Sequence, residues 1–202
     1  MGVIKKIQYG YPTNTKNYYL GIDPDLHTTA LAIIDSNQKV MAIEVIRATS
    51  LDKMVMAGGY IAKWLDTCLY TLFGSLLPAI RLTCVVEGQE SYLGPGRHAR
   101  VSDLLDLAYV AGACAAVCYA SPLVCDVLRP LPKQWKGTIP KKQKQEHICR
   151  KLGWKCVGRA DYVVPELLLV GSDINIMPDH IKSADWKHLL DAVGMALWAS
   201  DR

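Results

Sequence analysis

Two acidic residues end two apolar runs of the sequence. Asp23 closes YYLGID and Glu87 closes RLTCVVE, and each run has the length and composition of a buried β-strand. If the two strands are parallel neighbours, their end residues lie about 5 Å apart, the usual spacing between strands. Carboxylates at that separation repel each other unless a cation lies between them. A hard divalent ion such as Mg²⁺ prefers oxygen ligands, so the two acids indicate a metal site.

A further part of this site is predicted from a helix expected over residues 184–200. Asp185, His188 and Asp191 follow one another there at intervals of three. His188 and Asp191 share a helix face, whereas Asp185 lies roughly 120° around the axis from Asp191. We therefore expect only His188 and Asp191 to join the strand-end acids, and a pair of ions about 4 Å apart at such a site can hydrolyse phosphodiesters. The alternative is a turn acid, a solvated strand end and an exposed helix pair without a common role.

Positive charge is concentrated between residues 129 and 155. The chain has a formal net charge of +4, and this segment contains nine Lys and Arg residues with Glu146 as its single acid. Trp135 and Trp154 lie among them. Clustered basic side chains neutralise phosphates, and interleaved aromatic rings are typical of nucleic-acid-binding segments. The segment favours DNA contact, with a solvated helix face as the alternative interpretation.

Strands and helices must position these residues, and the hydrophobic pattern predicts both. Strands are expected over residues 18–23, 29–35, 39–46, 81–87 and 123–128, and helices over 51–73, 98–119, 141–151 and 184–200. Short links join the first three strands, which predicts an antiparallel meander. Helical crossovers lead to the last two strands, which predicts parallel pairing. The expected fold class is α/β, with a mixed five-stranded sheet flanked by helices.

Other features of the sequence bear on where the protein is located. Residues 107–125 carry no charge, but they are rich in Ala and Gly and include Ser121 and Pro122. We therefore expect a buried helix that runs into a buried strand rather than a membrane span. The first twenty residues lack the apolar region of a secretory signal, and seven cysteines without such a signal are typical of free thiols. We expect a cytoplasmic protein with no membrane partner.

Four segments follow one another along the chain: LGIDPDLHTTALAIID, CVVEGQESYLG, PKQWKGTIPKKQKQEH and HLLDAVGMALW. They resemble the four ordered motifs of the RuvC-type Holliday-junction resolvases of the RNase H-like superfamily, and the divergent phage members most closely. The resemblance covers about residues 18–150 and 184–200. It implies one RNase H-like nuclease domain over 18–202, with an N-terminal extension at 1–17 and an irregular insertion at about 157–183. It also implies a set of ligands for Mg²⁺ or Mn²⁺, two ions per site: Asp23, Glu87, His188 and Asp191.

The resemblance also assigns residues that contact DNA. Lys136 and one of Lys141, Lys142 or Lys144 would touch the scissile phosphate, which makes Lys136 a catalytic candidate. Tyr92, which follows the glutamate, would stack on unpaired junction bases. Other basic side chains complete the predicted DNA-binding set: Arg97, Arg100 and Lys133.

A homodimer is expected because a four-way junction has near two-fold symmetry and a symmetric cut requires two active sites. The helix predicted over 98–119 carries small residues that let another backbone approach closely: Ala108, Ala111, Gly112, Ala115 and Ala116. These small residues either pack on the sheet of the same chain or form the interface with a second subunit.

The sequence as a whole predicts a metal-dependent endonuclease that cuts branched DNA, most specifically a Holliday junction, without a nucleotide cofactor. Asp25 stands where the family usually has Gly, and its side chain could crowd the metal or add a ligand. It gives weight to one alternative, a catalytically inactive DNA-binding or scaffold protein of the same fold. Another alternative is a nuclease that acts on other branched DNA or on RNA–DNA hybrids. A third alternative is an ATPase or sugar-kinase-like protein, because GID followed by Thr28 and Thr29 resembles the first phosphate loop of those enzymes. The two lobes and the second phosphate motif that they need, which 202 residues cannot supply, weigh against it.

Overall fold

The centre of the protein is a five-stranded mixed sheet. The structure is a computed structural model that describes residues 15–48, 51–74, 79–88, 101–158, 163–165 and 181–202. The sheet consists of β1 (Lys16–Asp23), β2 (Thr28–Asp35), β3 (Val40–Arg47), β4 (Ile80–Val86) and β5 (Val124–Leu128). Its order is β3-β2-β1-β4-β5, with antiparallel pairing from β1 to β3 and parallel pairing of β4 with both β1 and β5. The predicted fold class is confirmed.

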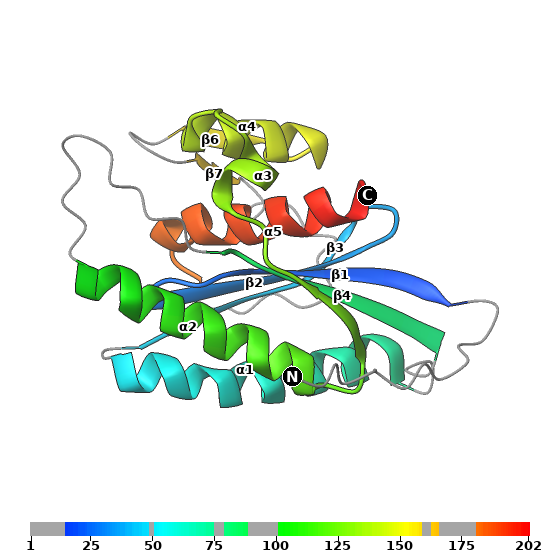
Figure 1. The fold of residues 1–202 in the computed structure, drawn as a ribbon. Coiled ribbons are helices and arrows are strands. Elements are labelled where there is room, and N and C mark those ends of the chain that lie inside the picture. The colour runs from blue at the N-terminus through cyan, green and yellow to red at the C-terminus, as the bar shows by residue number, and fades with distance from the viewer. Residues whose placement is uncertain (1–14, 49–50, 75–78, 89–100, 159–162, 166–180) are drawn as a thin grey trace.

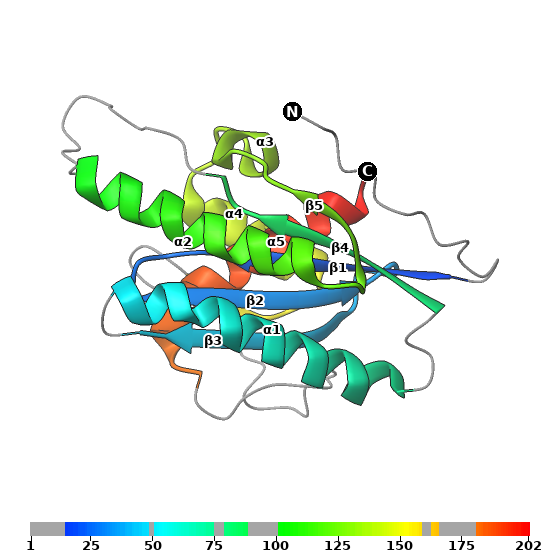
Figure 2. The ribbon, with the colours of Figure 1, turned by 60° about the horizontal axis from the view of Figure 1, so that its bottom comes forward.

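Helices cover both faces of the sheet and form distinct layers (Figure 1). The long helices α1 (Leu51–Phe73) and α2 (Val101–Ala120) lie on one face, and α5 (Trp186–Ser200) crosses the other. Figure 2, a turned view, shows α1 and α2 side by side in front of the sheet. Beyond α5 lie α3 (Pro132–Lys136), α4 (Lys141–Lys151) and a small hairpin of β6 (Cys156–Gly158) and β7 (Val163–Pro165). Because α5 lies between two layers, every residue from Leu189 to Leu197 is buried.

The alternation of side chains along the strands decides which face each acid occupies. The core against α1 and α2 includes Leu20 and Ile22 of β1 and Cys84 and Val86 of β4. Since successive side chains of a strand point to opposite faces, Asp23 and Glu87 belong to the other face, which α5 covers. The register pairs Ile22 with Val86, so the two acids come directly after neighbouring positions of parallel strands.

Gly21 allows α5 to pack closely against β1. A Cβ atom at this position would lie 1.9 Å from the carbonyl oxygen of Ala192, so the strand and helix backbones touch there. His188 precedes Ala192 by one helical turn, about 6 Å, and Asp23 follows Gly21 by two strand residues, about 6.6 Å. The close contact at Gly21 therefore brings His188 and Asp23 to the same place.

Four short elements were not predicted. Helix α3 has five residues, and strands β6 and β7 have three each. These lengths are too short for a hydrophobic period to be recognised. A short 3₁₀ turn, η3 (Ser183–Asp185), also precedes α5. Strand β1 begins at Lys16, two residues inside the extension predicted at 1–17. The β6–β7 hairpin lies within or beside the predicted insertion at 157–183.

One cysteine prediction is wrong. Free thiols were expected throughout, but a disulfide bond joins Cys149 near the end of α4 to Cys156 of β6. The chain turns back between them, with the Trp154 amide donating to the Cys149 carbonyl oxygen at 2.8 Å, so the two Cα atoms lie 6.7 Å apart. Of the other cysteines, Cys125 is partly exposed and four are buried: Cys68, Cys84, Cys114 and Cys118. Four cysteines thus behave as small core residues.

Helix α2 is buried on one side only. Its interior side includes Val110, Cys114 and Cys118, as expected for a core helix. Its other side exposes Leu105 and Tyr109, which are 65% and 63% accessible. It is also the one helix within the described ranges that is long and apolar enough to cross a membrane, which is weak support for a span because soluble core helices meet the same criteria.

Candidate active site

Asp23 and His188 form the first contact of the site. The Nδ1 atom of His188 lies 2.8 Å from Oδ2 of Asp23, across 165 residues of sequence. Both side chains are largely buried. The amide of Glu87 donates to the carbonyl oxygen of Ile22 at 3.2 Å, which extends the parallel ladder past the end of β4. Glu87 is thereby placed beside Asp23 at the carboxyl edge of the sheet.

Glu87 is held by two neighbouring residues of α3. The indole Nε1 of Trp135 donates to Glu87 Oε1 at 2.9 Å, and Nζ of Lys136 lies 3.6 Å from the same oxygen. Burial, followed by the charge of Asp23, raises the pKa of Glu87 to about 7, against the opposing effects of Lys136 and Trp135. The carboxyl groups of Asp23 and Glu87 therefore interact strongly, as two acids at the ends of adjacent strands should.

Asp191 is held by two residues of α4. Nζ of Lys141 lies 2.5 Å from Asp191 Oδ2, and the amide Nε2 of Gln145 donates to Oδ1 at 3.2 Å. Gln145 is fully buried and also donates to the Lys187 carbonyl oxygen at 2.9 Å, so it ties α4 to α5. Burial raises the pKa of Asp191, the charge of Lys141 opposes this, and Asp23 adds to it.

The charge of Lys141 interacts with all three acids of the candidate site. Burial lowers the pKa of Lys141, but the attraction of Asp191, then of Asp23, and finally of Glu87 outweighs it and raises the pKa. His188 thus contacts Asp23 directly, and the charges of Asp23, Glu87 and Asp191 act on Lys141, although these residues come from β1, the end of β4, and α5.

The donor set fits a hard divalent ion, because it consists of three carboxylates and an imidazole. As placed, however, no three His, Cys, Asp or Glu side chains among the described residues surround one point closely enough to hold an ion. The carboxylates are instead engaged by His188, Lys136, Lys141, Trp135 and Gln145. The negative charge of the site is compensated by protein groups.

The three alternative lysines of α4 have different surroundings. Only Lys141 contacts an acid of the cluster. Lys142 lies over β6, where its Nζ would be 3.6 Å from a Cβ atom on Gly158. Lys144 lines a cavity of about 100 Å³ with Lys151 and Asp201 among its other walls, and burial followed by the charge of Lys151 lowers its pKa. The geometry singles out Lys141.

The remaining predicted residues lie apart from the cluster or outside the described residues. Lys133 is exposed on α3. Tyr92, Arg97 and Arg100 fall outside the described ranges. Asp25 accepts a hydrogen bond from the His27 amide at 3.2 Å, so its carboxylate shapes the β1–β2 turn. As the helix geometry indicated, Asp185 is directed elsewhere, since it pairs with Arg47.

Sequence reasoning missed two residues of the site. Trp135 was expected to be a nucleic-acid aromatic, but only 3% of it is exposed and it packs near Gly194 while binding Glu87. Trp154 likewise packs edge-on against Trp186, with ring centroids 6.3 Å apart. Gln145 had a detectable signal, because it follows Lys141 by four residues and so shares its helix face.

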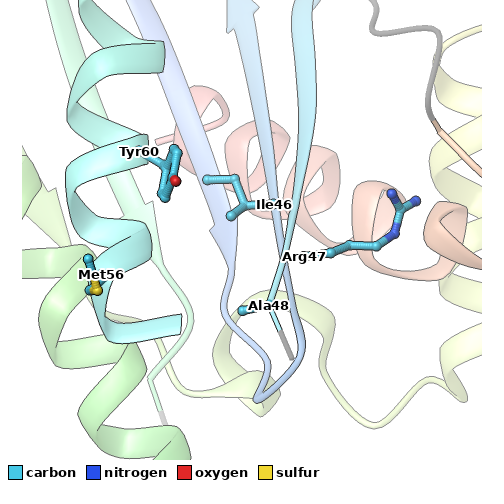
Figure 3. A pocket seen from close by; sticks show the side chains of 5 residues that line it. All are labelled: Ile46, Arg47, Ala48, Met56 and Tyr60. Atoms are coloured by element: carbon cyan, nitrogen blue, oxygen red, sulfur yellow. The ribbon is translucent and has the colours of Figure 1, made fainter. Parts of the chain in front are cut away.

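A larger cavity lies between β3 and α1. Its volume is about 550 Å³, and it is lined by Ile46, Arg47, Ala48, Met56 and Tyr60. Figure 3 shows the side chain of Arg47 pointing away from α1, where it pairs with Asp185. None of the clustered acids lines this cavity, so it is separate from the candidate site.

Comparisons with known proteins place the fold. No family model matches the chain, and no curated protein matches it in sequence. Among solved structures it is similar to Thermus thermophilus RuvC, with 17% identity, a TM-score of 0.52, and coverage of 90% of this chain and 92% of RuvC. It is also similar to T. thermophilus RuvC in complex with a Holliday junction substrate, with 15% identity, a TM-score of 0.50 and 90% coverage of both chains. The chain is therefore RuvC-like in fold, as its four sequence motifs indicated.

Proposed function

We propose that this protein is a metal-dependent endonuclease that cuts branched DNA, most specifically a Holliday junction. The observation that carries the proposal is the contact of His188 with Asp23 beside Glu87 at the carboxyl edge of the sheet, with Asp191 on the same helix as His188. His188 contacts Asp23 at 2.8 Å, Glu87 follows β4 beside it, and Lys141 interacts with all three acids. The RuvC-like fold supports this choice over other uses of an acidic cluster.

In this proposal the same four residues bind two Mg²⁺ or Mn²⁺ ions. Such ions supply an activated water and stabilise the leaving oxygen of a phosphodiester. The protein's own groups orient the ligands: Trp135 and Lys136 hold Glu87, and Gln145 holds Asp191. Ligands fixed in this way are ready for the ion without a large loss of side-chain freedom.

Lys136 and Lys141 are the proposed contacts of the scissile phosphate, because each already lies against a carboxylate of the site. The exposed Lys133 would bind the DNA backbone nearby. Tyr92, Arg97 and Arg100 stay sequence-based candidates for junction contacts. Since phosphate contacts supply much of the affinity, binding should weaken steeply as salt rises.

The proposed active form is a homodimer that pairs the exposed sides of α2. The small residues of this helix divide between its two faces: Ala111 and Ala115 are buried, whereas Ala108 and Ala116 are exposed and Gly112 is partly exposed. Leu105 and Tyr109 are exposed on the same helix, so the outward side offers apolar surface with room for close approach. An isologous pairing of this face would relate two sites by a two-fold axis.

The direct test is cleavage of a synthetic four-way junction in Mg²⁺. The wild type should give paired symmetric nicks. Asp23→Asn and Glu87→Gln should each reduce cleavage at least about a thousandfold, because each removes a charge that the ions require. Both should retain junction binding in a gel-shift assay, since the lysines are unchanged.

Asp126→Asn is the matched control, because Asp126 is an exposed strand acid whose carboxylate accepts only a local amide bond in the described contacts. It should cut like the wild type. Uncut but shifted junction with the wild-type protein would instead favour the inactive DNA-binding protein. Faster cleavage of a flap or an RNA–DNA hybrid would instead show that a four-way junction is not the preferred substrate.

A further inference from the structure

Lys141 occupies a central electrostatic position in the candidate site. Its ammonium group lies 2.5 Å from Asp191 and is also attracted by Asp23 and Glu87. No other lysine of α4 has this position, since Lys142 lies over β6 and Lys144 lines a separate cavity. The ammonium of Lys141 therefore occupies the position to which the acids would most strongly attract a divalent ion.

The two partners of this ion pair differ in how easily they can move. Only 5% of the Asp191 side chain is exposed, whereas 41% of the Lys141 side chain is. Asp191 is also fixed by Gln145 and by its place in the buried helix α5. Lysine has a flexible four-carbon stem, so Lys141 can withdraw into solvent while the carboxylate stays in place.

We infer that Lys141 is a built-in counter-ion that stabilises the metal-free site and is displaced when a divalent cation binds. This rests on the proposed function, in which the acids bind Mg²⁺ or Mn²⁺. Without an ion, three largely buried carboxylates would repel one another, and Lys141 offsets part of that repulsion. Binding of an ion must break the Lys141–Asp191 pair, so Lys141 weakens metal affinity and makes occupancy depend on the metal concentration. The displaced ammonium is then available to a phosphate at the edge of the site.

The test compares Mn²⁺ binding by the wild type, Lys141→Met and Lys142→Met, measured by calorimetry on the full chain without DNA. Lys142→Met is the matched control, because it removes the same charge from the adjacent position of the same helix. Lys141→Met should bind Mn²⁺ about tenfold or more tightly than the wild type, because an ammonium beside the ion no longer competes with it. Lys142→Met should bind like the wild type.

Thermal unfolding provides a second measurement. In a chelator, Lys141→Met should melt at a lower temperature than Lys142→Met, because Asp191 loses its counter-ion. Saturating Mn²⁺ should raise the melting temperature of Lys141→Met by more than that of the wild type. If the methionine variant does not fold without metal, Lys141→Gln, which keeps a polar stem, takes its place in both measurements.

The outcomes separate this inference from the proposed function. Mn²⁺ binding by all three proteins with equal affinity would overturn the role of Lys141 and leave the metal site standing. Weaker binding by Lys141→Met would overturn it as well, by showing that the lysine assists the ion. Absence of Mn²⁺ binding from every variant would overturn the metal-dependent function itself.

Discussion

At the scale of single residues, Glu87 gives the clearest dependence on pH. Its folded-state pKa is raised to about 7 from 4.5 by burial and by Asp23. A carboxyl group with a raised pKa favours folding below pH 4.5, and that contribution is lost as the pH rises through about 7. We therefore compare the free energy of unfolding of Glu87→Gln with that of the wild type, both without metal. The difference should favour the variant by roughly 2 kcal/mol more at pH 8 than at pH 5.

Chemical denaturation in a chelator at the two pH values checks this. Glutamine keeps an oxygen that can accept the Trp135 hydrogen bond, so the comparison isolates the charge. An equal effect of Glu87→Gln at both pH values would show that Glu87 titrates normally. Adding Mg²⁺ at pH 8 should favour the wild type instead, because only the carboxylate can bind the ion.

The indole N–H of Trp135 is expected to lower the pKa of Glu87. Trp135→Phe keeps an aromatic ring in the core but removes the donor to Glu87 Oε1. The loss of a hydrogen bond to a charged acceptor costs about 1.5–3 kcal/mol, so stability at pH 8 should fall by that order. The pKa of Glu87 should rise further, which would shift the pH dependence of unfolding upward.

Trp154→Phe is the control for that experiment, because Trp154 packs against Trp186 rather than against Glu87. It should lower stability without moving the pH dependence. A similar pH shift in both variants would mean that general loosening of the core, not the indole hydrogen bond, acts on Glu87.

The sequence singled out the acids and the histidine of the candidate site but not the groups that contact them. The positions of Asp23 and Glu87 at strand ends, and of His188 and Asp191 on one helix face, depend on local periods of two and 3.6 residues. Trp135 and Gln145 reach the site because α3 and α4 fold over α5, and that layer depends on long-range packing. Local patterns carry no information on it.

At the scale of elements, the contact between β1 and α5 governs both the core and the site. Gly21→Ala would place a Cβ atom 1.9 Å from the Ala192 carbonyl oxygen, and backbone atoms cannot rotate away as a side chain can. Overpacking typically costs about 1–3 kcal/mol, and a backbone clash should reach the upper part of that range. The displaced helix should also separate His188 from Asp23 and abolish cleavage.

Gly59→Ala on α1 is the matched control, since a Cβ atom there meets nothing within 4 Å. An alanine in a helix is up to about 1 kcal/mol more favourable than glycine, so this variant should melt at or above the wild-type temperature. Denaturant unfolding of both variants measures the difference. A Gly21→Ala protein as stable as the wild type would contradict the close packing described.

The long elements were predictable and the short ones were not. The predicted helices over 51–73 and 141–151 coincide with α1 and α4, because each has many residues over which a pattern can repeat. Helix α3 and the β6–β7 hairpin depend instead on their neighbours, including the link from Cys149 to Cys156. Nothing in an odd number of cysteines indicated which two would meet.

At the scale of the whole molecule, the proposed homodimer can be broken at a single position. Gly112 is partly exposed on α2, and a Cβ atom there meets nothing within 4 Å in the monomer. Gly112→Arg should therefore leave the fold intact while placing a bulky charge in an apolar interface. Sedimentation should show a monomer, and symmetric paired nicks should become single nicks.

Gln143→Arg adds the same charge on the exposed side of α4 and should leave the sedimentation coefficient unchanged. A wild-type protein that sediments as a monomer at micromolar concentration, with or without junction DNA, would refute the dimer. Equal dissociation of both variants would point to net charge rather than to the α2 surface.

The position of α5 between two layers also has a consequence for biosynthesis. Asp23 and Glu87 are translated early, but His188, Asp191 and the buried middle of the molecule come from residues 186–200. A ribosome must therefore synthesise the chain almost through Ser200 before either the interior or the proposed catalytic centre can close. Prematurely terminated polypeptides would lack His188 and Asp191 and would leave one face of the sheet uncovered, so they would be exposed to degradation.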